Sequence, residues 1–341
     1  MSCLAWNCRG LGNPCTIREL EDLIRAKDPS VVFLAETWAD EARLKEVKRN
    51  LGFDNLHFVE RINRGGGLAL FWKHTVDLQV QTSSKNHIDA IINKGVDGAW
   101  RLTCFYGDPV THKRFESWNL LRDLNSRMDL PWLCMGDFNE ITRQSEKLGG
   151  SIRSQAQMQR FRDVIDECGF MDLGFTGSQF TWKKHFIDGH SVWERLDQGL
   201  ATREWMLKFA GTRVHHLPSF TSDHNPLWIV LRDLIFSTTT KPFKFEEMWL
   251  AEKGCTDTIQ AVWAEQDSTN LGIRVIKKIE KCGVELKKWS MKSFGSIRRE
   301  LELKKKEIVK AEKEAMRSGQ NFRVKELMLE LNNLMEKEAR M

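Results

Sequence analysis

The ten residues WLCMGDFNEI, at positions 132–141, decide the fold of this 341-residue chain. The apolar run from Trp132 to Met135 has the length and composition of a buried strand, and Asp137 and Asn139 follow it at once. In α/β proteins, residues just past the ends of strands face the cleft where ligands bind. We therefore expect Asp137 and Asn139 to lie in a functional site at the end of this strand.

Five further segments have the same form, with polar side chains beside or within an apolar run. They are Trp6-Asn7, Leu34-Ala35-Glu36-Thr37, Phe105-Tyr106-Gly107-Asp108-Pro109, Glu194-Arg195-Leu196-Asp197 and Ser222-Asp223-His224-Asn225-Pro226. Each segment alone fits a turn or a helix cap as well as a site. As a set they combine carboxylate and amide oxygens, which suit Mg²⁺, with an Asp–His pair that can polarise an imidazole. This set is typical of metal-assisted hydrolysis of a phosphodiester.

Length and composition exclude several classes of protein. At roughly 150 residues per domain the chain has room for about two domains. With 41% hydrophobic and 29% charged residues, it has the composition of a globular protein. It has no apolar run of about 18 residues and no signal-peptide pattern, so we expect no membrane partner. The eight scattered cysteines lack metal-site spacing and predict reduced, mostly buried thiols of an intracellular protein.

The basic residues are concentrated in the C-terminal third. The chain has 52 Lys and Arg against 47 Asp and Glu, a formal net charge of +5. Residues 1–240 contain 30 of each kind, whereas residues 241–341 contain 22 basic and 17 acidic residues. This excess is compatible with nucleic-acid binding but far from a histone-like charge. We interpret the run Lys304-Lys305-Lys306 as a solvated helix face, with nucleic-acid contact as the less favoured alternative.

The first 235 residues alternate short apolar runs with amphipathic stretches. The predicted helices are 14–27, 40–51, 113–127 and 154–168. The predicted strands are 2–7, 31–34, 56–60, 68–72, 76–81, 87–92, 100–106, 132–135, 179–182, 192–201 and 227–231. Runs of consecutive strands interrupted by helices predict a layered α/β or α+β domain with mixed sheets. The pattern does not give the strand order.

The chain changes character after this region. A polar linker is expected over residues 236–249, and a helical, basic C-terminal arm over 250–341. In the arm, apolar residues recur at helical spacing between Leu271 and Trp289. The pair Ser318-Gly319 predicts a break before a last helix. The predicted organisation is thus one domain over 1–235, a linker and an arm.

The order of the motifs resembles the endonuclease/exonuclease/phosphatase superfamily, which includes pancreatic DNase and the apurinic/apyrimidinic endonucleases. More closely, it resembles the endonuclease domain of plant LINE-type non-LTR retrotransposons. The matching segments are AWNCRGLGNP (5–14), FLAETW (33–38), RGGGLALFW (64–72), WLCMGDFNEI (132–141), LGGSIRS (148–154), FTW (180–182), VWERLDQGLA (192–201) and HLPSFTSDHNPL (216–227). The tail resembles the connector that precedes the reverse transcriptase, through KFEEMWL (244–250) and LKKWSMKSFGSI (286–297).

The resemblance implies a fold and an activity. The fold would be the four-layered α/β sandwich of the DNase I-like type, here followed by the helical arm. The activity would be that of a Mg²⁺-dependent endonuclease, with Mn²⁺ as an alternative metal, which nicks a DNA strand and leaves a 3′-hydroxyl. The implied partners are a DNA substrate and, in an intact element, retroelement RNA or a reverse transcriptase region. We expect that region to lie outside these residues, because the sequence has no Asp-Asp pair.

The resemblance also assigns roles residue by residue. The implied metal ligands are Asn7, Glu36, Asp137 and Asp223. The implied catalytic residues are Tyr106, Asp137, Asn139, Asp197 and His224. The implied phosphate or DNA contacts are Asn7, Tyr106, Asn139, Arg195 and His224.

Within these sets Asp137 would orient or deprotonate the attacking water and help to protonate the leaving group, and which of these roles dominates stays open. Asp197 would hold the imidazole of His224, which would stabilise charge on the phosphate or act as a base. Tyr106, the one tyrosine of the chain, would contact the scissile phosphate. The pair His215-His216 is expected to have a structural role.

Two positions depart from the family pattern. Arg9 stands where the apurinic endonucleases have an acid, which weakens any expectation of abasic-site specificity. Gln198 stands where related retroelements often have a basic residue. A second hypothesis is therefore a catalytically silent retroelement fragment that binds nucleic acid or a partner, and a third is a phosphatase or sphingomyelinase of the same superfamily. For an active endonuclease we expect an intracellular, nuclear location.

Overall fold

The computed structural model describes the chain except for residues 62–65, 232–252, 265–270, 294 and 340–341. The contacts between residues divide the chain into two compact units. The first unit contains Met1–Ile235 together with Glu312–Arg323, and the second contains Phe236–Ala311 together with Val324–Met341. The predicted linker and the KFEEMWL motif lie wholly outside the described residues.

The described part of the first unit is rich in strands. Its strands are β1 (Ser2–Asn7), β2 (Val31–Ala35), β3 (Asn55–Val59), β4 (Leu68–Trp72), β5 (Leu78–Ser84), β6 (His87–Ile92), β7 (Trp100–Tyr106), β8 (Trp132–Asp137), β9 (Lys147–Leu148), β10 (Phe170–Asp172), β11 (Thr176–Gly177), β12 (Trp182–His185), β13 (Ser191–Glu194), β14 (Asp197–Thr202), β15 (Arg213–His216) and β16 (Leu227–Val230). Its helices are α1 (Pro14–Lys27), α2 (Glu41–Leu51), α3 (Arg114–Arg127), α4 (Gln155–Glu167) and α5 (Arg203–Lys208), with 3₁₀ turns at Thr111–Lys113 and Gln144–Glu146.

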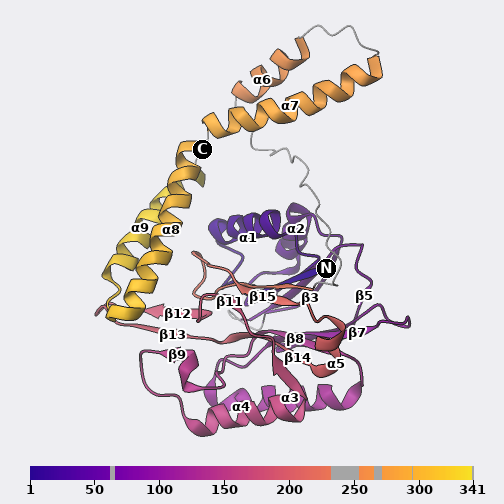
Figure 1. Cartoon of the computed structure of the whole chain (residues 1–341), viewed down its shortest axis with the longest axis vertical. Coiled ribbons are helices and arrows are strands. Elements are labelled where there is room, and N and C mark those ends of the chain that lie inside the picture. The colour runs from indigo at the N-terminus through magenta and orange to yellow at the C-terminus, as the bar shows by residue number, and fades with distance from the viewer. Residues whose placement is uncertain (62–65, 232–252, 265–270, 294, 340–341) are drawn as a thin grey trace. The chain divides into compact units, whose positions relative to one another are not determined.

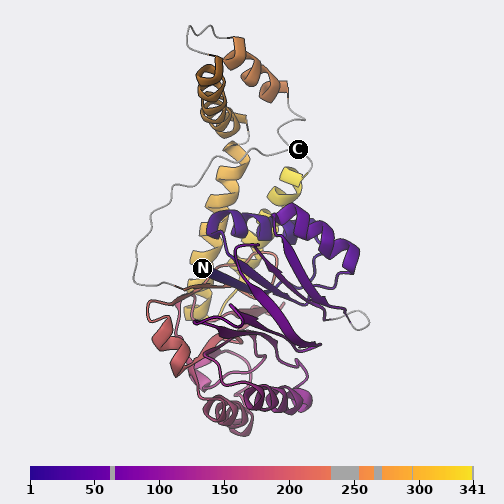
Figure 2. The ribbon, with the colours of Figure 1, turned by 90° about the vertical axis from the view of Figure 1, so that its right-hand side faces the viewer.

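Two mixed sheets pack face to face between two layers of helices (Figures 1 and 2). The seven-stranded sheet has the order β11-β15-β16-β1-β2-β4-β3, and the six-stranded sheet has the order β10-β14-β8-β7-β6-β5. Helices α1 and α2 cover the outer face of the first sheet, and α3 and α4 cover the outer face of the second. This arrangement confirms the predicted four-layered α/β sandwich. A small third sheet, β12-β13-β9, lies beside the two large ones.

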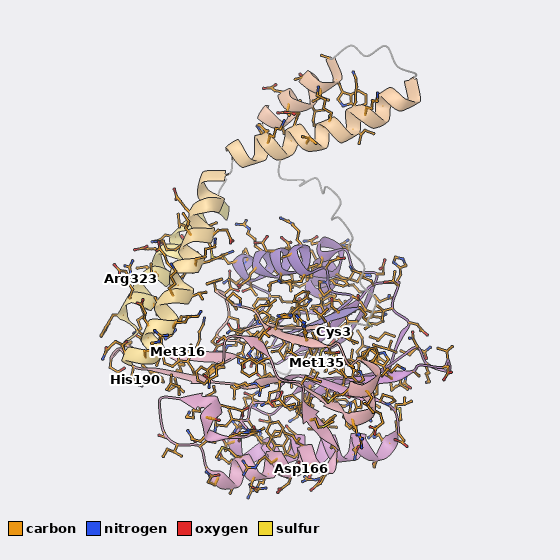
Figure 3. The ribbon with its side chains drawn as sticks, viewed as in Figure 1. Cys3, Met135, Asp166, His190, Met316 and Arg323 are labelled. Carbon is orange, nitrogen blue, oxygen red and sulfur yellow. The ribbon has the colours of Figure 1, made fainter. Side chains whose placement is uncertain are left out.

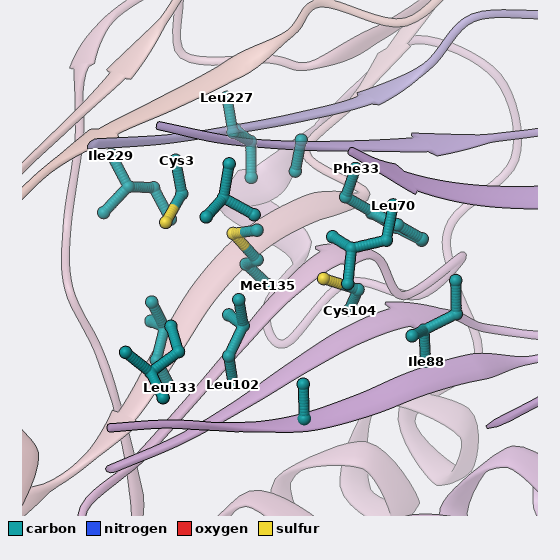
Figure 4. Packing of buried hydrophobic residues seen from close by; sticks show 14 of the residues in the cluster. Cys3, Phe33, Leu70, Ile88, Leu102, Cys104, Leu133, Met135, Leu227 and Ile229 are labelled. Atoms are coloured by element: carbon teal, nitrogen blue, oxygen red, sulfur yellow. The ribbon is translucent and has the colours of Figure 1, made fainter. Parts of the chain in front are cut away.

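The main core lies between the two large sheets. Figure 4 shows Cys3, Phe33 and Leu70 of one sheet facing Leu102, Cys104 and other apolar side chains of the opposite sheet. Side chains fill the space between the layers (Figure 3). Because β1, β2 and β8 are buried on both faces, most of their residues form continuous apolar runs in the sequence. The eight cysteines are free thiols, and all except Cys15 are buried.

Local sequence signals fix the helix ends on the outer face of the first sheet. The Asn13 side chain accepts a hydrogen bond from the backbone N–H of Cys15, and Pro14 occupies the first helical position of α1. Asp40 caps α2 in the same way, and Gly52 ends that helix with a left-handed φ of 71°. These boundaries agree with the predicted ones to within a residue.

The structure corrects two predicted strands. The strand expected over residues 179–182 begins only at Trp182 and continues to His185 as β12. Residues 192–201 were expected to form a single strand, but they divide into β13 of the small sheet and β14 of the six-stranded sheet. The backbone of Arg195 donates to Glu146 O, and that of Leu196 donates to Thr181 Oγ1, so the chain leaves one sheet before it enters the next. Sequence periodicity could not show this, because both strands are buried.

The second unit is helical where it is described. Helices α6 (Lys253–Ala264) and α7 (Leu271–Ser293) pack through Cys255 and Leu286. Helices α8 (Gly295–Ser318) and α9 (Phe322–Ala339) follow, and the break between them occurs at the predicted Ser318-Gly319. In the basic run, Lys304 pairs with Glu307 and Glu330, and Lys305 pairs with Glu302. No helix among the described residues is long and apolar enough to cross a membrane.

The turn between α8 and α9 belongs to the first unit. The fully buried Asn321 donates from Nδ2 to His190 O at 2.7 Å and to Ser191 Oγ at 2.8 Å. Its backbone N–H donates to Gly189 O at 2.9 Å. His190 accordingly lies beside this turn in Figure 3. Residues more than a hundred positions downstream thus contact the β12–β13 hairpin.

Candidate active site

The first half of the site comes from two parallel strands of the seven-stranded sheet. In the register of β1 and β2, Asn7 is opposite Ala35, so that Glu36 follows at the same edge. The loops after these strands are joined by backbone hydrogen bonds from Cys8 to Ala35 and from Gly10 to Glu36. The parallel pairing therefore places Asn7 and Glu36 side by side, as expected for strand ends.

The second half comes from the six-stranded sheet. Parallel β7 and β8 pair Tyr106 with Asp137, and antiparallel β14 pairs Asp197 with Asp137. Two glycines allow the backbones to approach at this point. A Cβ on Gly136, whose φ is +139°, would lie 2.1 Å from Phe105 O, and a Cβ on Gly107 would lie 2.2 Å from Phe138 O.

His224 connects the two carboxylates of the second sheet. Its Nδ1 lies 2.9 Å from Asp197 Oδ2, and its Nε2 lies 3.8 Å from Asp137 Oδ2. The three side chains are at most 5% exposed. In this Asp–His–Asp chain the imidazole is buried and is held in one orientation between two carboxylates.

Asn7 joins this chain to the first half of the site. Its Nδ2 lies 3.0 Å from both Glu36 Oε1 and Asp137 Oδ2, and it stands 3.5 Å from His224 Nε2. Tyr106 donates its phenolic hydrogen to the same Glu36 oxygen at 2.8 Å. The predicted residues from both sheets are therefore connected by direct contacts.

Asn139 and Asp223 complete the cluster. The Asn139 backbone donates to Asp137 Oδ1 at 2.8 Å, and its side chain donates to Gly107 O at 2.9 Å. Asp223 Oδ2 accepts a hydrogen bond of 3.0 Å from the indole of Trp182. These hydrogen bonds hold the carboxylates of Asp137 and Asp223 in place, and their donors are not members of the Asp–His–Asp chain.

Burial and neighbouring charges set the protonation of the site. Burial is the largest effect on Asp137, and with the charge of Asp197 it raises the pKa of Asp137 to about 7 against the opposing charge of His224. Burial disfavours charge on His224, but Asp197 and Asp137 outweigh it and raise the pKa of the imidazole to about 10. Burial, together with Glu36 and Asp137, raises the pKa of Tyr106 far above its usual range. At neutral pH the phenol is therefore neutral and the imidazole is positively charged.

Two groups of side chains are candidates for a metal ion. Asp137, Asp197 and His224 have ligand atoms within 4.8 Å of one another. In this group, however, His224 Nδ1 is already hydrogen-bonded to Asp197. We therefore interpret the three side chains as a proton-transfer chain rather than as a set of metal ligands.

Glu36 and Asp223 fit a hard cation better. Asp223 Oδ1 is buried and accepts no hydrogen bond, and it faces a positive group, the guanidinium of Arg9, at 3.3 Å. Glu36 Oε2 faces the same guanidinium at 3.4 Å. Carboxylate oxygens that converge on a cation are the donor set that Mg²⁺ prefers.

Arg195 is the one predicted site residue whose contacts lie outside this cluster. Its guanidinium pairs with Asp172 at 2.6 Å and with Glu146 at 2.9 Å, and it stacks on Phe175. The side chain is only 4% exposed. These ion pairs give Arg195 a structural role, and its phosphate contact stays a prediction.

The loops that carry the site have unusual backbone conformations. Arg9, Glu36, Trp38 and Asn139 all have φ between 48° and 54°, the left-handed region that non-glycine residues rarely adopt. A residue keeps such a strained conformation only where contacts with the surrounding structure hold it, and strained residues are frequent at functional sites. The strained residues support the assignment of this edge as the site.

Several residues that position the site lie in the quoted motifs but were not among the predicted site residues. Thr181 Oγ1 accepts hydrogen bonds from the backbones of Leu196 and Asp197, at 3.0 and 2.9 Å. Ser222 Oγ accepts from the His224 backbone and donates to Asn7 O. Trp6 donates to His224 O at 3.0 Å. A hydroxyl or indole in a short buried segment looks the same in sequence whether or not it supports a catalytic group.

Comparisons with solved structures agree with this fold. The endonuclease domain of TRAS1, a telomere-specific non-LTR retrotransposon, aligns with a TM-score of 0.52 and 16% identity, over 69% of this chain and 99% of that one. An AP endonuclease from Archaeoglobus fulgidus aligns with a TM-score of 0.54 and 14% identity, over 68% and 99% of the two chains. The AP endonuclease LMAP from Leishmania major gives 0.53 and 15%, over 68% and 87%.

No curated protein sequence matches the chain. The sequence profile of a family does match it, over residues 4–224, which contain every residue of the candidate site. The buried Asp–His–Asp chain, the strand-end carboxylates and this match lead to one conclusion: the chain belongs to the Endonuclease/Exonuclease/phosphatase family.

Proposed function

We propose that this protein is a divalent-metal-dependent phosphodiesterase that nicks DNA and leaves a 3′-hydroxyl, with Mg²⁺ as the metal and Mn²⁺ as an alternative. The observation that carries the proposal is the Asp197–His224–Asp137 chain, which Asn7 links to the Glu36 carboxylate. Hydrolysis of a phosphodiester needs a proton acceptor, positive charge near the phosphate and a metal-binding acid. The side chains of the cluster offer a candidate for each of these three roles.

Each side chain has a role that follows from its contacts. Asp137, with a pKa of about 7, can accept a proton from water and return it to a leaving oxygen. The charged imidazole of His224, held by Asp197, can stabilise negative charge on a phosphate oxygen. The phenol of Tyr106 is a hydrogen-bond donor that stays neutral. A metal ion held by Glu36 and Asp223 would supply a Lewis acid for the phosphate.

DNA is the substrate we propose, and an origin in a non-LTR retrotransposon is part of the same proposal. The support is the TRAS1 domain, which shares the fold, and the motif order of residues 5–227. A retroelement RNA or a reverse transcriptase as partner, and a nuclear location, stay predictions from the resemblance.

A plasmid-nicking assay tests the proposal. The purified chain is incubated with supercoiled DNA and Mg²⁺, Mn²⁺ or EDTA. We expect relaxed circles with either metal and none with EDTA. Loss of a group that stabilises the transition state costs about a hundredfold or more in rate, so Glu36→Gln, Asp137→Asn and His224→Asn should each abolish visible nicking.

Glu41→Gln is the matched control, because Glu41 is an exposed carboxylate on α2 that pairs only with Lys45 in the contacts described. It should nick like the wild type. Absence of nicking by the folded wild-type chain across metals and salt concentrations would sink the proposal and favour a catalytically silent binding protein.

A further inference from the structure

Arg9 is a positive side chain within the proposed metal site. Its Nη1 is 3.4 Å from Glu36 Oε2, and its Nε is 3.3 Å from Asp223 Oδ1. The Arg9 side chain is 45% exposed, whereas the two carboxylates are 10% and 29% exposed. A guanidinium therefore reaches from the solvent side to the two acids that would hold a divalent ion.

The backbone of Arg9 is fixed, whereas its side chain is held weakly. Arg9 has a φ of 52°, and the next residue, Gly10, has its N–H bonded to Glu36 O. A Cβ on Gly10 would lie 2.6 Å from the ring of Trp38, so the loop is packed tightly at this point. Both contacts of the guanidinium, in contrast, are longer than the roughly 2.8 Å of a strong charge-assisted hydrogen bond.

An aromatic ring already lies beside the guanidinium in the position where it contacts the carboxylates. Trp38 is partly exposed, and its ring centroid is 5.6 Å from Arg9 Cζ, within the range of a cation–π contact. Arg61 bonds to the carbonyl of Trp38 at 3.1 Å and adds a further positive charge. If Arg9 leaves the carboxylates, it stays beside an aromatic ring and a second arginine, where a nucleic-acid backbone can bind.

Resting on the proposed function, we propose that Arg9 is a tethered cation that occupies the carboxylate pair in the metal-free protein and is displaced when a divalent ion binds. The displaced guanidinium then contacts a DNA phosphate beside Trp38. The physical reason is that Mg²⁺ binds carboxylate oxygens at about 2.1 Å, and a guanidinium on the same oxygens would repel it at short range.

The first test measures metal affinity without DNA. Arg9→Gln removes the charge and keeps most of the length, so Mn²⁺ should bind it about threefold to tenfold more tightly than the wild type in calorimetric titration. Arg9→Lys keeps the charge and should remain near wild type. Arg25→Gln is the matched control, because Arg25 is 49% exposed and also pairs with a carboxylate, that of Asp22; its affinity should not change.

Thermal unfolding gives a second reading of the same competition. Without metal, Arg9→Gln should melt below the wild type, because Glu36 and Asp223 lose their compensating charge. Saturating Mg²⁺ should close this gap, because the metal replaces the missing cation.

The third test measures DNA binding in the Asp137→Asn background, where cleavage is blocked. Adding Arg9→Gln should weaken binding to a DNA duplex in Mg²⁺. It should also reduce the slope of log affinity against log salt concentration by about 0.9, the value of one lost phosphate contact.

The outcomes separate this inference from the proposed function. Equal or weaker Mn²⁺ binding by Arg9→Gln overturns the inference even if the wild type nicks plasmid, because the Arg9 charge would then not compete with the metal ion. Absence of metal binding in both proteins, without nicking, overturns both. An unchanged salt slope overturns the DNA contact.

Discussion

At the scale of single residues, the site depends on buried polar groups that hold the proposed catalytic side chains in position. Thr181 is fully buried, and its hydroxyl oxygen accepts the backbone N–H groups of Leu196 and Asp197. We expect Thr181→Val, which keeps the shape, to lower the free energy of unfolding by about 1–3 kcal/mol, because two buried donors lose their acceptor. We also expect it to lower the nicking rate, because Asp197 loses its fixed position against His224. Urea denaturation and plasmid nicking measure these effects.

Thr181→Ser is the control, since serine keeps the accepting oxygen and loses only a methyl group. It should retain most of the nicking rate of the wild type. Equal nicking rates for Thr181→Val and the wild type would contradict a positioning role for this hydroxyl.

At the scale of elements, a fully buried ion pair joins β6, β7 and α3. Arg101 bonds Asp89 at 2.8 and 3.0 Å and the carbonyl of Leu124 at 2.6 Å, and both charged side chains are 0% exposed. We expect Arg101→Met to lower the free energy of unfolding by about 3–5 kcal/mol, because it leaves Asp89 charged and unpaired in the core. Urea denaturation followed by tryptophan fluorescence measures this loss.

The double variant Asp89→Leu/Arg101→Met should recover much of that stability, since it removes both charges. The surface pair of Arg122 and Glu167 is the matched control: its side chains are 39% and 50% exposed, and Arg122→Met should cost less than about 1 kcal/mol. A double variant no more stable than Arg101→Met would contradict this account.

At the scale of the whole molecule, the first unit takes part of its structure from the far end of the chain. Lys183 donates to Glu312 at 2.5 Å and to Ser219 O at 3.2 Å, and Asn321 binds the β12–β13 hairpin. We expect Asn321→Ala to speed hydrogen exchange of amides 182–194 in the full chain, because it removes three hydrogen bonds to the hairpin. Exchange followed by mass spectrometry measures this change.

The exposed residue Arg317, in the last turn of α8, provides the control, and Arg317→Ala should leave the exchange of residues 182–194 unchanged. Identical exchange in Asn321→Ala and the wild type would show that the hydrogen bonds of the Asn321 side chain do not stabilise the hairpin.

Short-range signals in the sequence were enough for the ends of α1 and α2 and for the type of fold, but they did not predict the short helix α5. Asn13-Pro14 and Asp40 with Gly52 mark the ends of α1 and α2, because capping depends on neighbours within a few residues. The apolar runs marked most strands in the same way. The two-residue β9 and the largely polar β15, in contrast, carry too little apolar pattern to be found.

The sequence by itself thus determined the apolar strands, the polar groups at their ends and the order of motifs that suggested the family. Only the tertiary structure decided that Arg195 pairs with Asp172 and Glu146, that Thr181 holds Asp197, and that Arg9 lies between Glu36 and Asp223. The physical reason is distance along the chain. Local pattern reports burial and capping, but the choice of a charged group's partner depends on strand register and loop packing between residues tens to hundreds of positions apart.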